Sequence, residues 1–560
     1  MKLVSNTKYL FYSFWFICLF IQAYFTEITY DEAYYWMYSR ELTWGYFDHP
    51  PAIAFIIKLG YSLFSNELGV RLIPIILSTL TIFILEKIIK PKEIKTFFML
   101  VMAVGLLHFI GFFAIPDSPL LFTSVLYLFI YQKFIIKPNL LKSLLLGFVI
   151  ALMCLSKYHA IIIIFLTILS NLKLLINKYF WIAAITTCLF LIPHVYWQIS
   201  AGFPSIYYHL FERSTEAYKF TYSIEYIASQ LVLLGPITGI LFFIAAIKIK
   251  ADNQFEKTLK TLFWGGYIFF FLMSFKGRIE AHWTLFIVLP AIYFGYYYLI
   301  KLKNTNKVIN YIFSISLLLI IIVRVFIAID IKSTTSSIIY KPTKQFRNKE
   351  KMLAIKKQAK EYPVAFMNSY QDASLYSFYT KSEGFSLNNT KGRKNQFDIW
   401  NVEEKYRGQK IMMIPNYNVK EFDSIKGISK TIRYHFIDNF QSFSKVKIEV
   451  NNFKNTVVKS DTLKLTISLK NTFKNKIDFS ANKEYPSFAY YQFFEGKKLI
   501  KQQKGFKISN KTLNKDLKVK IITPDKPDNY GLYLTIKTGW LPTTINSERY
   551  KIRVLENMND

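Results

Sequence analysis

Between Lys8 and Asp330, apolar runs alternate with short polar connectors, and each run is long enough to cross a bilayer. A spanning helix needs about 20 apolar residues, because lipid cannot satisfy the hydrogen bonds of an open backbone. Beyond Asp330 no apolar run reaches that length. The sequence therefore predicts a polytopic helical membrane protein whose C-terminal part is exposed to water.

Eleven runs qualify as predicted spans. They lie near 9–25, 70–89, 96–114, 119–136, 141–155, 158–176, 179–198, 226–247, 260–275, 282–300 and 308–329. The first run has the length of a signal peptide, but no cleavage site of small residues follows it, so we expect an uncleaved anchor.

Lysines mark one side of the predicted membrane domain. They gather in the connectors that follow even-numbered spans, as in 87–95 and 248–260, and near the N-terminus. Positively charged loops stay cytoplasmic, so the remaining loops (26–69, 114–118, 156–157, 199–225 and 276–281) are expected outside. An odd number of spans then places the C-terminal part outside as well.

Three domains are expected. Residues 1–330 form the transmembrane domain, and residues 331–440 form a connector with a small α/β unit. Residues 445–560 alternate apolar and polar side chains, as in 446–450, 463–467 and 532–536. Alternation with period two, punctuated by turn residues, predicts a β-sandwich-like domain.

The formal charge of +33 is uneven, and about two thirds of the excess lies after residue 330. Such a charge indicates either a solvated lysine-rich surface or attraction to an anionic membrane face or lipid substrate. A nucleic-acid partner is not expected for a domain tied to a membrane.

The three cysteines, Cys18, Cys154 and Cys188, lie in apolar spans without metal-ligand spacing, which argues against disulfides and zinc.

The first outer loop carries paired carboxylates. Asp31 and Glu32 precede the aromatic run 34–36, and Asp48 and His49 follow in the segment 45–51. Ionisable groups beside a bilayer are costly to keep, and carboxylates can act as general bases or hold a cation. The alternative is a helix N-cap beside an interfacial aromatic belt.

Two further outer positions stand out. Asp117 lies between Pro116 and Pro119, where it serves either a site or a helix cap. Lys157 lies in an outer connector, where the lysine rule disfavours it, so it is either an anion ligand or a snorkelling lysine.

The loop 276–283 combines two cations, a carboxylate and an imidazole. These are Lys276, Arg278, Glu280 and His282. A cation pair can bind a phosphate, although a plain charged loop is the alternative. His108, His159 and His194 lie within or beside spans and are expected to hydrogen-bond between helices.

A set of motifs in a fixed order carries a family resemblance. The segments are 31–36, 45–51, 116–121, 155–158, 280–283, 370–374 and 395–400. In these segments the chain resembles the bacterial branch of the GT-C glycosyltransferases, relatives of protein O-mannosyltransferases and of the lipid A aminoarabinose transferase. The resemblance ends before the β-rich tail, and His282-Trp283 stands where many relatives have Asn-Trp.

The resemblance implies a multi-pass enzyme of the bacterial inner (cell) membrane. It would transfer a sugar from a polyprenyl-phosphate donor to an extracytoplasmic lipid, polysaccharide or protein, with inversion. Asp31 would be the catalytic base. The donor and acceptor cavity would include Glu32, Tyr34, Tyr35, Asp48, His49 and Asp117; Lys157, Lys276 and Arg278 would bind the lipid phosphate; Glu280, His282, Tyr370 and Gln371 would support the site.

The resemblance requires no cofactor. It leaves open whether a divalent metal binds, and Asp31, Glu32 and His49 are the residues that could hold one.

Two other functions compete with the transferase. One is a transporter or flippase of lipid-linked sugars, which polytopic bundles with buried ionisable groups often are. The other is a membrane scaffold that carries the outer domain.

Overall fold

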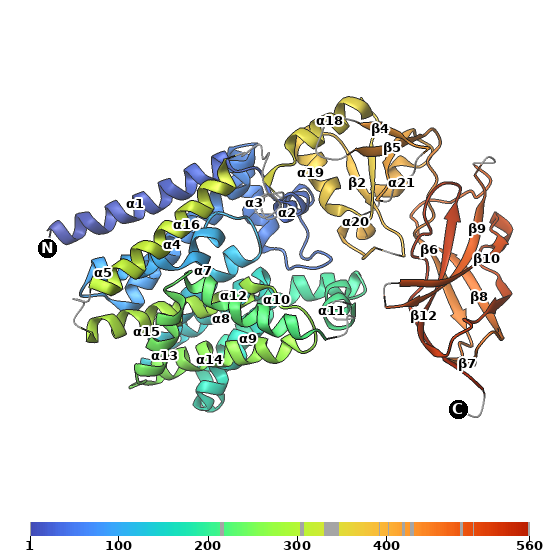
Figure 1. Ribbon diagram of the computed structural model, residues 1–560. Helices are drawn as coiled ribbons and strands as arrows, with labels where there is room; N and C mark the ends of the chain where they lie inside the picture. The colour runs from blue at the N-terminus through green and yellow to red at the C-terminus, as the bar shows by residue number, and fades with distance from the viewer. Residues whose placement is uncertain are drawn as a thin grey trace. The chain divides into compact units, whose positions relative to one another are not determined.

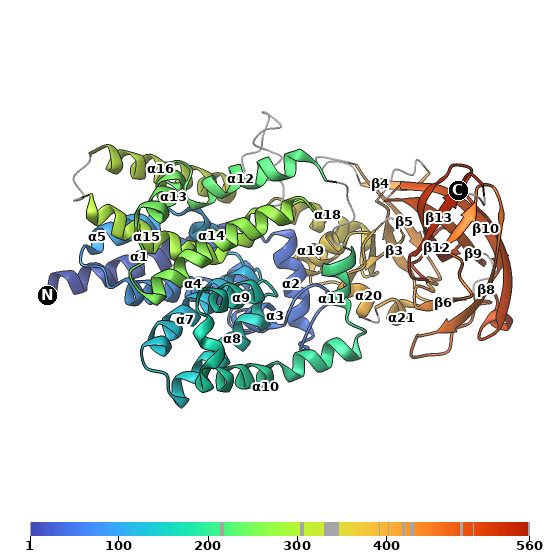
Figure 2. The same cartoon turned by 90° about the horizontal axis from the view of Figure 1, so that it is seen from below.

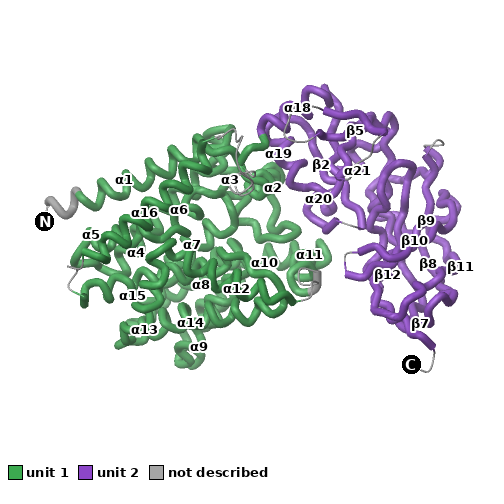
Figure 3. The backbone as a smooth tube through the Cα atoms, in the orientation of Figure 1, with its two compact units in different colours: residues 1–348 green, residues 349–560 purple. Residues whose placement is uncertain are grey.

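The computed structural model describes residues 2–557 except 213–217, 303–306, 330–345, 391, 401, 417–420, 426–430, 482–484 and 497. The chain forms two compact units, residues 1–348 and residues 349–560 (Figure 3). The boundary between them falls after the predicted end of the transmembrane domain at 330. Residues 331–345 of the predicted connector lie outside the described part.

Unit 1 is helical (Figure 1). Its elements are α1 (Lys2–Phe25), α2 (Tyr30–Arg40), α3 (Ala52–Leu63), α4 (Glu67–Ile89), α5 (Ile94–Ala103), α6 (Gly105–Ile110), α7 (Asp117–Ile136), α8 (Leu140–Ser156), α9 (Ala160–Ser170), η1 (Leu172–Ile176), α10 (Lys178–Ser200), α11 (Pro204–Tyr207), η2 (Tyr208–Glu212), α12 (Phe220–Leu234), α13 (Gly239–Lys248), α14 (Gln254–Ser274), η3 (Ala281–Ile287), α15 (Val288–Lys301) and α16 (Lys307–Ala328).

Six stretches among the described residues are long and apolar enough to span a membrane, and a bent helix pair makes a seventh. The six include α1, α4, α7, α10, α16 and the joined η3 and α15. Other predicted spans appear as shorter apolar helices, among them α5, α8 and α9. These helices confirm the polytopic helical fold that the apolar runs predicted.

Burial separates the outer helices from the central ones. In the apolar windows of α1, α10 and α16 no more than 22% of residues are buried, against 78% in the window over η3 and α15. The exposed side chains of the outer helices are large and apolar, such as Ile17, Ile185 and Leu318. An apolar surface of this extent suits a lipid environment.

Two predicted spans are broken. Span 96–114 becomes α5 and α6, which meet at the extended residue Val104. Span 226–247 becomes α12 and α13, which meet at an angle of 89°. Gly235 ends α12 with a φ of 144°, and a Cβ there would lie 2.5 Å from the carbonyl oxygen of Ala103, so only glycine fits this bend.

Unit 2 begins with an α/β half. The strands β1 (Val364–Met367), β2 (Gly384–Leu387), β3 (Ile411–Ile414), β4 (Asp423–Ile425) and β5 (Ile432–Ile437) form one sheet in the order β2-β1-β3-β5-β4. β1 pairs in parallel with β2 and β3, whereas β5 pairs antiparallel with β3. The helices are α18 (Lys349–Ala359), α19 (Tyr370–Thr380), α20 (Gln396–Ile399) and α21 (Val402–Tyr406).

The second half of unit 2 is a β-sandwich (Figure 2). One sheet has the order β10-β9-β12-β13-β7 and the other β11-β8-β6. The strands are β6 (Val446–Asn451), β7 (Thr456–Val458), β8 (Thr462–Asn471), β9 (Ser487–Glu495), β10 (Lys498–Lys507), β11 (Asp516–Ile522), β12 (Asp528–Thr538) and β13 (Tyr550–Leu555). Alternate side chains of both sheets, such as Ile467 and Leu534, share one core, which confirms the predicted sandwich.

Candidate active site

Glu32 and Arg71 form an ion pair that is fully buried. Arg71, on α4, donates from Nε and a terminal nitrogen to the two oxygens of Glu32, each at 2.7 Å. The other donors of Arg71 reach the backbone oxygens of Ala23, Thr26 and Glu27. The pair thereby joins the end of α1, the start of α2 and the first turns of α4.

The carboxylate of Glu32 has three further donors. It accepts from the amide and hydroxyl of Thr29, which closes the capping box of α2, and from the amide of Ala114. Burial alone would raise the pKa of Glu32, but Arg71 and these donors hold it below its usual range. Because five donors occupy its carboxylate, Glu32 acts as a positioning residue. Through the amide of Ala114 it fixes the backbone three residues before Asp117.

Asp117 and Lys157 form a second buried pair. Lys157 Nζ lies 2.8 Å from each carboxylate oxygen of Asp117. Asp117 is the first residue of α7 and Lys157 follows the last residue of α8, so consecutive antiparallel helices bring the two together at one end of the bundle. The structure thus gives Lys157 a counter-charge within the chain, where the sequence suggested an anion ligand or a snorkelling side chain.

His282 extends this pair. It stands near the start of η3, and its Nε2 lies 3.7 Å from the second carboxylate oxygen of Asp117. The His282 side chain is about a third exposed, whereas that of Asp117 is buried. A protonated His282 would share the carboxylate of Asp117 with Lys157.

The segment 45–51 lies beside the same cluster. Asp48 is buried and accepts from the hydroxyl of Tyr38 at 2.5 Å, while its backbone oxygen lies 2.9 Å from Nε2 of His209 on η2. His49 follows, and its buried Nδ1 has no hydrogen-bond partner among the described residues. Burial lowers the pKa of His49 to about 3. The positive charge of Lys157 and the neighbouring His209 lower it as well, whereas the carboxylate of Asp48 opposes the shift, so the imidazole is neutral at physiological pH.

Asp31 differs from its neighbour Glu32. It lies in the first turn of α2 with an exposed side chain, on a helix whose next eight residues are buried. An exposed carboxylate beside a rigidly held helix start can receive a proton from an incoming hydroxyl or amine. The two adjacent carboxylates, which look equivalent in the sequence, therefore stand in opposite environments.

The aromatic residues of α2 are packed. Tyr34 is buried against Tyr38, with ring centroids 4.7 Å apart, and Trp36 packs on Tyr61. Tyr35 meets the edge of His49 at 5.4 Å. Tyr35 therefore links α2 to His49, another of the predicted cavity residues. Tyr34 packs on Tyr38 and stabilises α2.

The cations of the loop 276–283 are exposed. Arg278 lies 3.8 Å from Glu225 with both side chains more than half exposed, which is a weak interaction in water. Lys276 is exposed and Glu280 is half-buried ahead of η3. These side chains belong to the loop that leads into His282.

Tyr370 and Gln371 belong to unit 2, at the start of α19. The guanidinium of Arg393 stacks over the ring of Tyr370 at 4.7 Å and donates to its hydroxyl at 2.7 Å. Both predicted support residues are half-buried. Both contribute to the packing of unit 2 itself.

Sequence reasoning missed Arg71, Tyr38 and His209. Arg71 lies in an apolar helix run, where an arginine without a partner is too costly to keep, so its presence was a signal for a buried carboxylate. Tyr38 and His209 carry no such signal, because their role depends on the path of the loop 41–51. Among the described residues, no group of three His, Cys, Asp or Glu side chains has the arrangement of a metal site.

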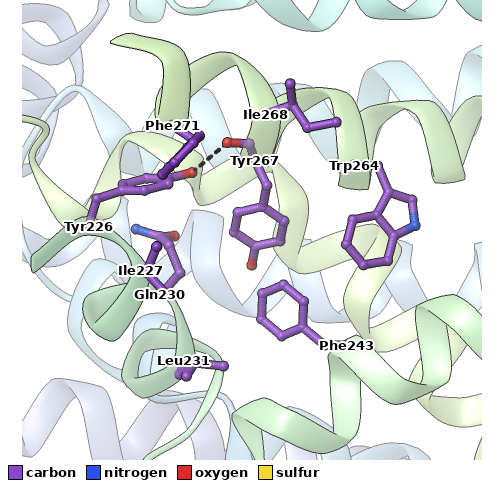
Figure 4. Close-up of a pocket in the computed structure, with 9 residues that line it drawn as sticks. All are labelled: Tyr226, Ile227, Gln230, Leu231, Phe243, Trp264, Tyr267, Ile268 and Phe271. Atoms are coloured by element: carbon purple, nitrogen blue, oxygen red, sulfur yellow. Dashed lines mark hydrogen bonds between the residues drawn. The ribbon is translucent and has the colours of Figure 1, made fainter. Parts of the chain in front are cut away.

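An apolar groove of about 390 Å³ lies between α12, α13 and α14 (Figure 4). It is lined by Tyr226, Ile227, Gln230, Leu231, Phe243, Trp264, Tyr267, Ile268 and Phe271. Gln230 connects it to the cluster, because its amide donates to the backbone oxygen of Ala281 and accepts from Thr284. Ala281 directly precedes His282, so the groove wall and the charged cluster share η3.

Residues 48–197 match the model of a family described as dolichyl-phosphate-mannose-protein mannosyltransferase. No curated protein compared with the chain matches it. Two solved structures are similar: ArnT from Cupriavidus metallidurans in the apo state (TM-score 0.57) and the same protein bound to undecaprenyl phosphate (TM-score 0.53). Each is 11% identical and covers 77% of this chain and 98% of its own.

The matched segment contains Asp48, His49, Asp117 and Lys157. The fold shared with ArnT extends over three quarters of the chain. The chain therefore shares the fold of ArnT over 77% of its length, and the family match over residues 48–197 agrees with the resemblance seen in the sequence.

Proposed function

We propose that this chain is an integral membrane glycosyltransferase that moves a sugar from a polyprenyl-phosphate donor to an extracytoplasmic acceptor. The observation that carries the proposal is the charged cluster of Asp117, Lys157 and His282 beside the neutral His49, inside the segment that matches a mannosyltransferase family. The similar ArnT structure that holds undecaprenyl phosphate supports a donor of this class.

The transfer is proposed as one displacement with inversion. The acceptor oxygen or nitrogen attacks the anomeric carbon, the bond from that carbon to the phosphate oxygen breaks, and polyprenyl phosphate leaves with the bonding electrons. Asp31 takes the acceptor proton, since its carboxylate is exposed at the start of a buried helix. Glu32 and Arg71 hold that helix start in place.

Cations stabilise the leaving phosphate in this proposal. Lys157 is neutralised by Asp117 in the described state, so it helps only as Asp117 shares its charge with His282. Lys276 and Arg278 are exposed on the loop before η3 and are the proposed first contacts of the phosphate. His49 and Asp48 complete the wall of the cavity.

The groove between α12, α13 and α14 is proposed to receive part of the prenyl chain. Its lining is almost wholly apolar, and Ile227 and Ile268 on its rim are about half exposed, so it is open to lipid. An apolar chain in the groove would place its phosphate toward η3, because Gln230 links the two. Burial of hydrocarbon provides the driving force for this placement.

The proposed location is the bacterial inner membrane, with a cytoplasmic N-terminus and an extracytoplasmic unit 2. The lysine-rich alternate connectors support this orientation. A thiol-specific, membrane-impermeant reagent tests it on a variant with one cysteine at Ser480, an exposed position of unit 2. Labelling of intact spheroplasts supports the orientation, and labelling only after lysis contradicts it.

Sugar transfer in membranes that contain the wild type or Asp31→Asn tests the function. A panel of polyprenyl-phosphate sugars serves as donor, with membrane lipids and envelope polymers as acceptors. We expect consumption of one donor by the wild type and a loss of at least a hundredfold in the variant at equal protein level. Equal consumption by both proteins contradicts the role of Asp31, and transport of an intact donor favours the flippase.

The β-sandwich is proposed to help recognise the acceptor. Deletion of residues 445–560 should abolish transfer to the native acceptor, and transfer that continues after the deletion contradicts this role. No cofactor is part of the proposal, and chelation with EDTA should leave transfer unchanged. Activity that returns only on addition of a divalent metal contradicts that part.

A further inference from the structure

Arg324 is the one charged residue of α16 between Lys307 and the end of the helix at Ala328. Its helix is among the most apolar of the chain and only 17% of its apolar window is buried. A charged side chain in such a position is costly and is retained for a function or a specific partner. Arg324 itself is half-buried, on the side of α16 that meets α1.

Each described contact of Arg324 is to a neutral group. Its Nε donates to the side-chain oxygen of Gln22 at 3.2 Å, and one terminal nitrogen donates to the backbone oxygen of Cys18 at 2.7 Å. The other terminal nitrogen lies 3.2 Å from Nδ1 of His108. Nε2 of His108 lies 2.9 Å from the backbone oxygen of Met102 and donates to it, so Nδ1 is the acceptor of a neutral ring.

Two buried cations of unit 1, Arg71 and Lys157, provide the contrast. Arg71 is paired with Glu32 and Lys157 with Asp117, whereas no carboxylate contacts Arg324 among the described residues. A guanidinium has five N–H donors, of which the contacts to α1 and α6 use three. Among the described residues no group takes the other two donors, so these donors and the full positive charge can meet a group from outside the chain.

The surroundings of Arg324 indicate the kind of group. α1 and α16 meet where Cys18 and Gln22 contact Arg324, and Gln22 and Arg324 lie within about two turns of the ends of their helices. Around them Ile21, Val323 and Val325 expose apolar side chains, and Tyr24 is exposed near the end of α1 as interfacial aromatics are. Because these apolar side chains face lipid, an anion that reaches Arg324 is expected to be the head group of a molecule with apolar chains.

We infer that Arg324 binds the phosphate of a membrane phospholipid whose acyl chains lie along α1 and α16. The two remaining N–H donors match two phosphate oxygens, which is the geometry that favours arginine over lysine. The inference concerns a face of the bundle that the proposed transfer does not use, so it stands or falls independently of that function.

Binding of defined lipids to the delipidated full chain tests the inference. Phosphatidylglycerol is titrated in detergent and bound lipid is counted by native mass spectrometry, with diacylglycerol as the probe that lacks a phosphate. We expect binding of phosphatidylglycerol and none of diacylglycerol, and we expect the affinity to be at least tenfold weaker in Arg324→Gln, because the charge-assisted contact with the phosphate is lost. Lys307→Gln, at the other end of α16, is the matched control and should bind as the wild type does.

A second variant keeps the arginine in place. Gln22→Glu puts a carboxylate beside Nε of Arg324, so the chain neutralises its own cation and lipid binding should weaken while the melting temperature rises. Equal affinity in Arg324→Gln and wild type, or equal binding of diacylglycerol, overturns the inference. Displacement of phosphatidylglycerol by a lower concentration of undecaprenyl phosphate also overturns it, because the site then belongs to a polyprenyl phosphate.

Discussion

Lys157 Nζ lies 2.8 Å from both carboxylate oxygens of Asp117, and both side chains are buried at the point where α7 begins and α8 ends. The pair is neutral as a whole. A phosphate that uses Lys157 must therefore compete with Asp117, and His282, 3.7 Å away, is placed to take part of that carboxylate's charge.

Removal of one partner of this pair should be more damaging than removal of both. We expect Lys157→Met to lower the free energy of unfolding by about 3 kcal/mol, because a buried carboxylate loses its counter-charge. Asp117→Leu combined with Lys157→Met should recover most of that loss in thermal unfolding in detergent, yet remain inactive. Lys58→Met, at an exposed position of α3, is the control. A double variant as unstable as the single one contradicts this account.

The adjacent carboxylates Asp31 and Glu32 should separate activity from stability. Glu32→Gln leaves Arg71 buried without a counter-charge, so we expect a loss of about 3 kcal/mol of stability. Asp31→Asn changes an exposed side chain and should leave the melting temperature within error while turnover falls at least a hundredfold. Melting temperature and donor consumption are measured on the same samples of both variants. Equal melting temperatures would show that the ion pair of Glu32 and Arg71 does not stabilise the fold.

The same ion pair of Glu32 and Arg71 predicts a loss of stability in acid. The pKa of Glu32 is lowered in the folded chain, so its stabilisation is present above the unfolded pKa of about 4.3 and is lost as the pH falls through the lower folded value. Glu32→Gln should therefore remove part of the difference in melting temperature between pH 6 and pH 4. An unchanged difference contradicts the prediction.

Unit 2 should respond to pH in the opposite direction through Asp398. Burial raises the pKa of this carboxyl to about 6, against hydrogen bonds from Asn395 and Asn388. A raised folded pKa adds stability that is present at low pH and is lost as the pH rises through about 6.

Asp398→Asn keeps an oxygen for both donors and removes the titration. We expect it to stabilise unit 2 by about 1–2 kcal/mol at pH 7.5 and to have little effect at pH 5. Fluorescence-detected unfolding of the full chain at both pH values measures this. A destabilised variant at pH 7.5 contradicts the raised pKa.

Filling the groove should weaken the use of long-chain donors. Leu231→Trp places a larger side chain in the groove, so we expect the KM for a polyprenyl-phosphate sugar to rise at least tenfold with a smaller change for a short-chain analogue. Ile240→Trp, at an exposed position of α13, is the matched control. An equal effect on long and short donors would place the prenyl chain elsewhere.

The sequence by itself determined the architecture. Apolar runs of spanning length need no tertiary information to be recognised, because each helix satisfies its own backbone in lipid. Period-two alternation after residue 445 likewise predicted the sandwich that the two sheets form. The ordered motifs also brought Asp48, His49, Asp117 and Lys157 into one predicted site, and His49, Asp117 and Lys157 do lie together.

Only the tertiary structure decided which charged side chains are paired within the chain and which are exposed or lack a counter-charge among the described residues. Glu32 and Asp31 are alike in the sequence, but a helix turns adjacent side chains by about 100°, so one meets Arg71 and the other meets solvent. The partner of Lys157 lies 40 residues away and that of Arg71 39 residues away, distances at which no local pattern reports a contact. Arg324 is visible in the sequence as a lone charge in a span, yet the lack of any carboxylate beside it among the described residues follows only from how α1, α6 and α16 pack.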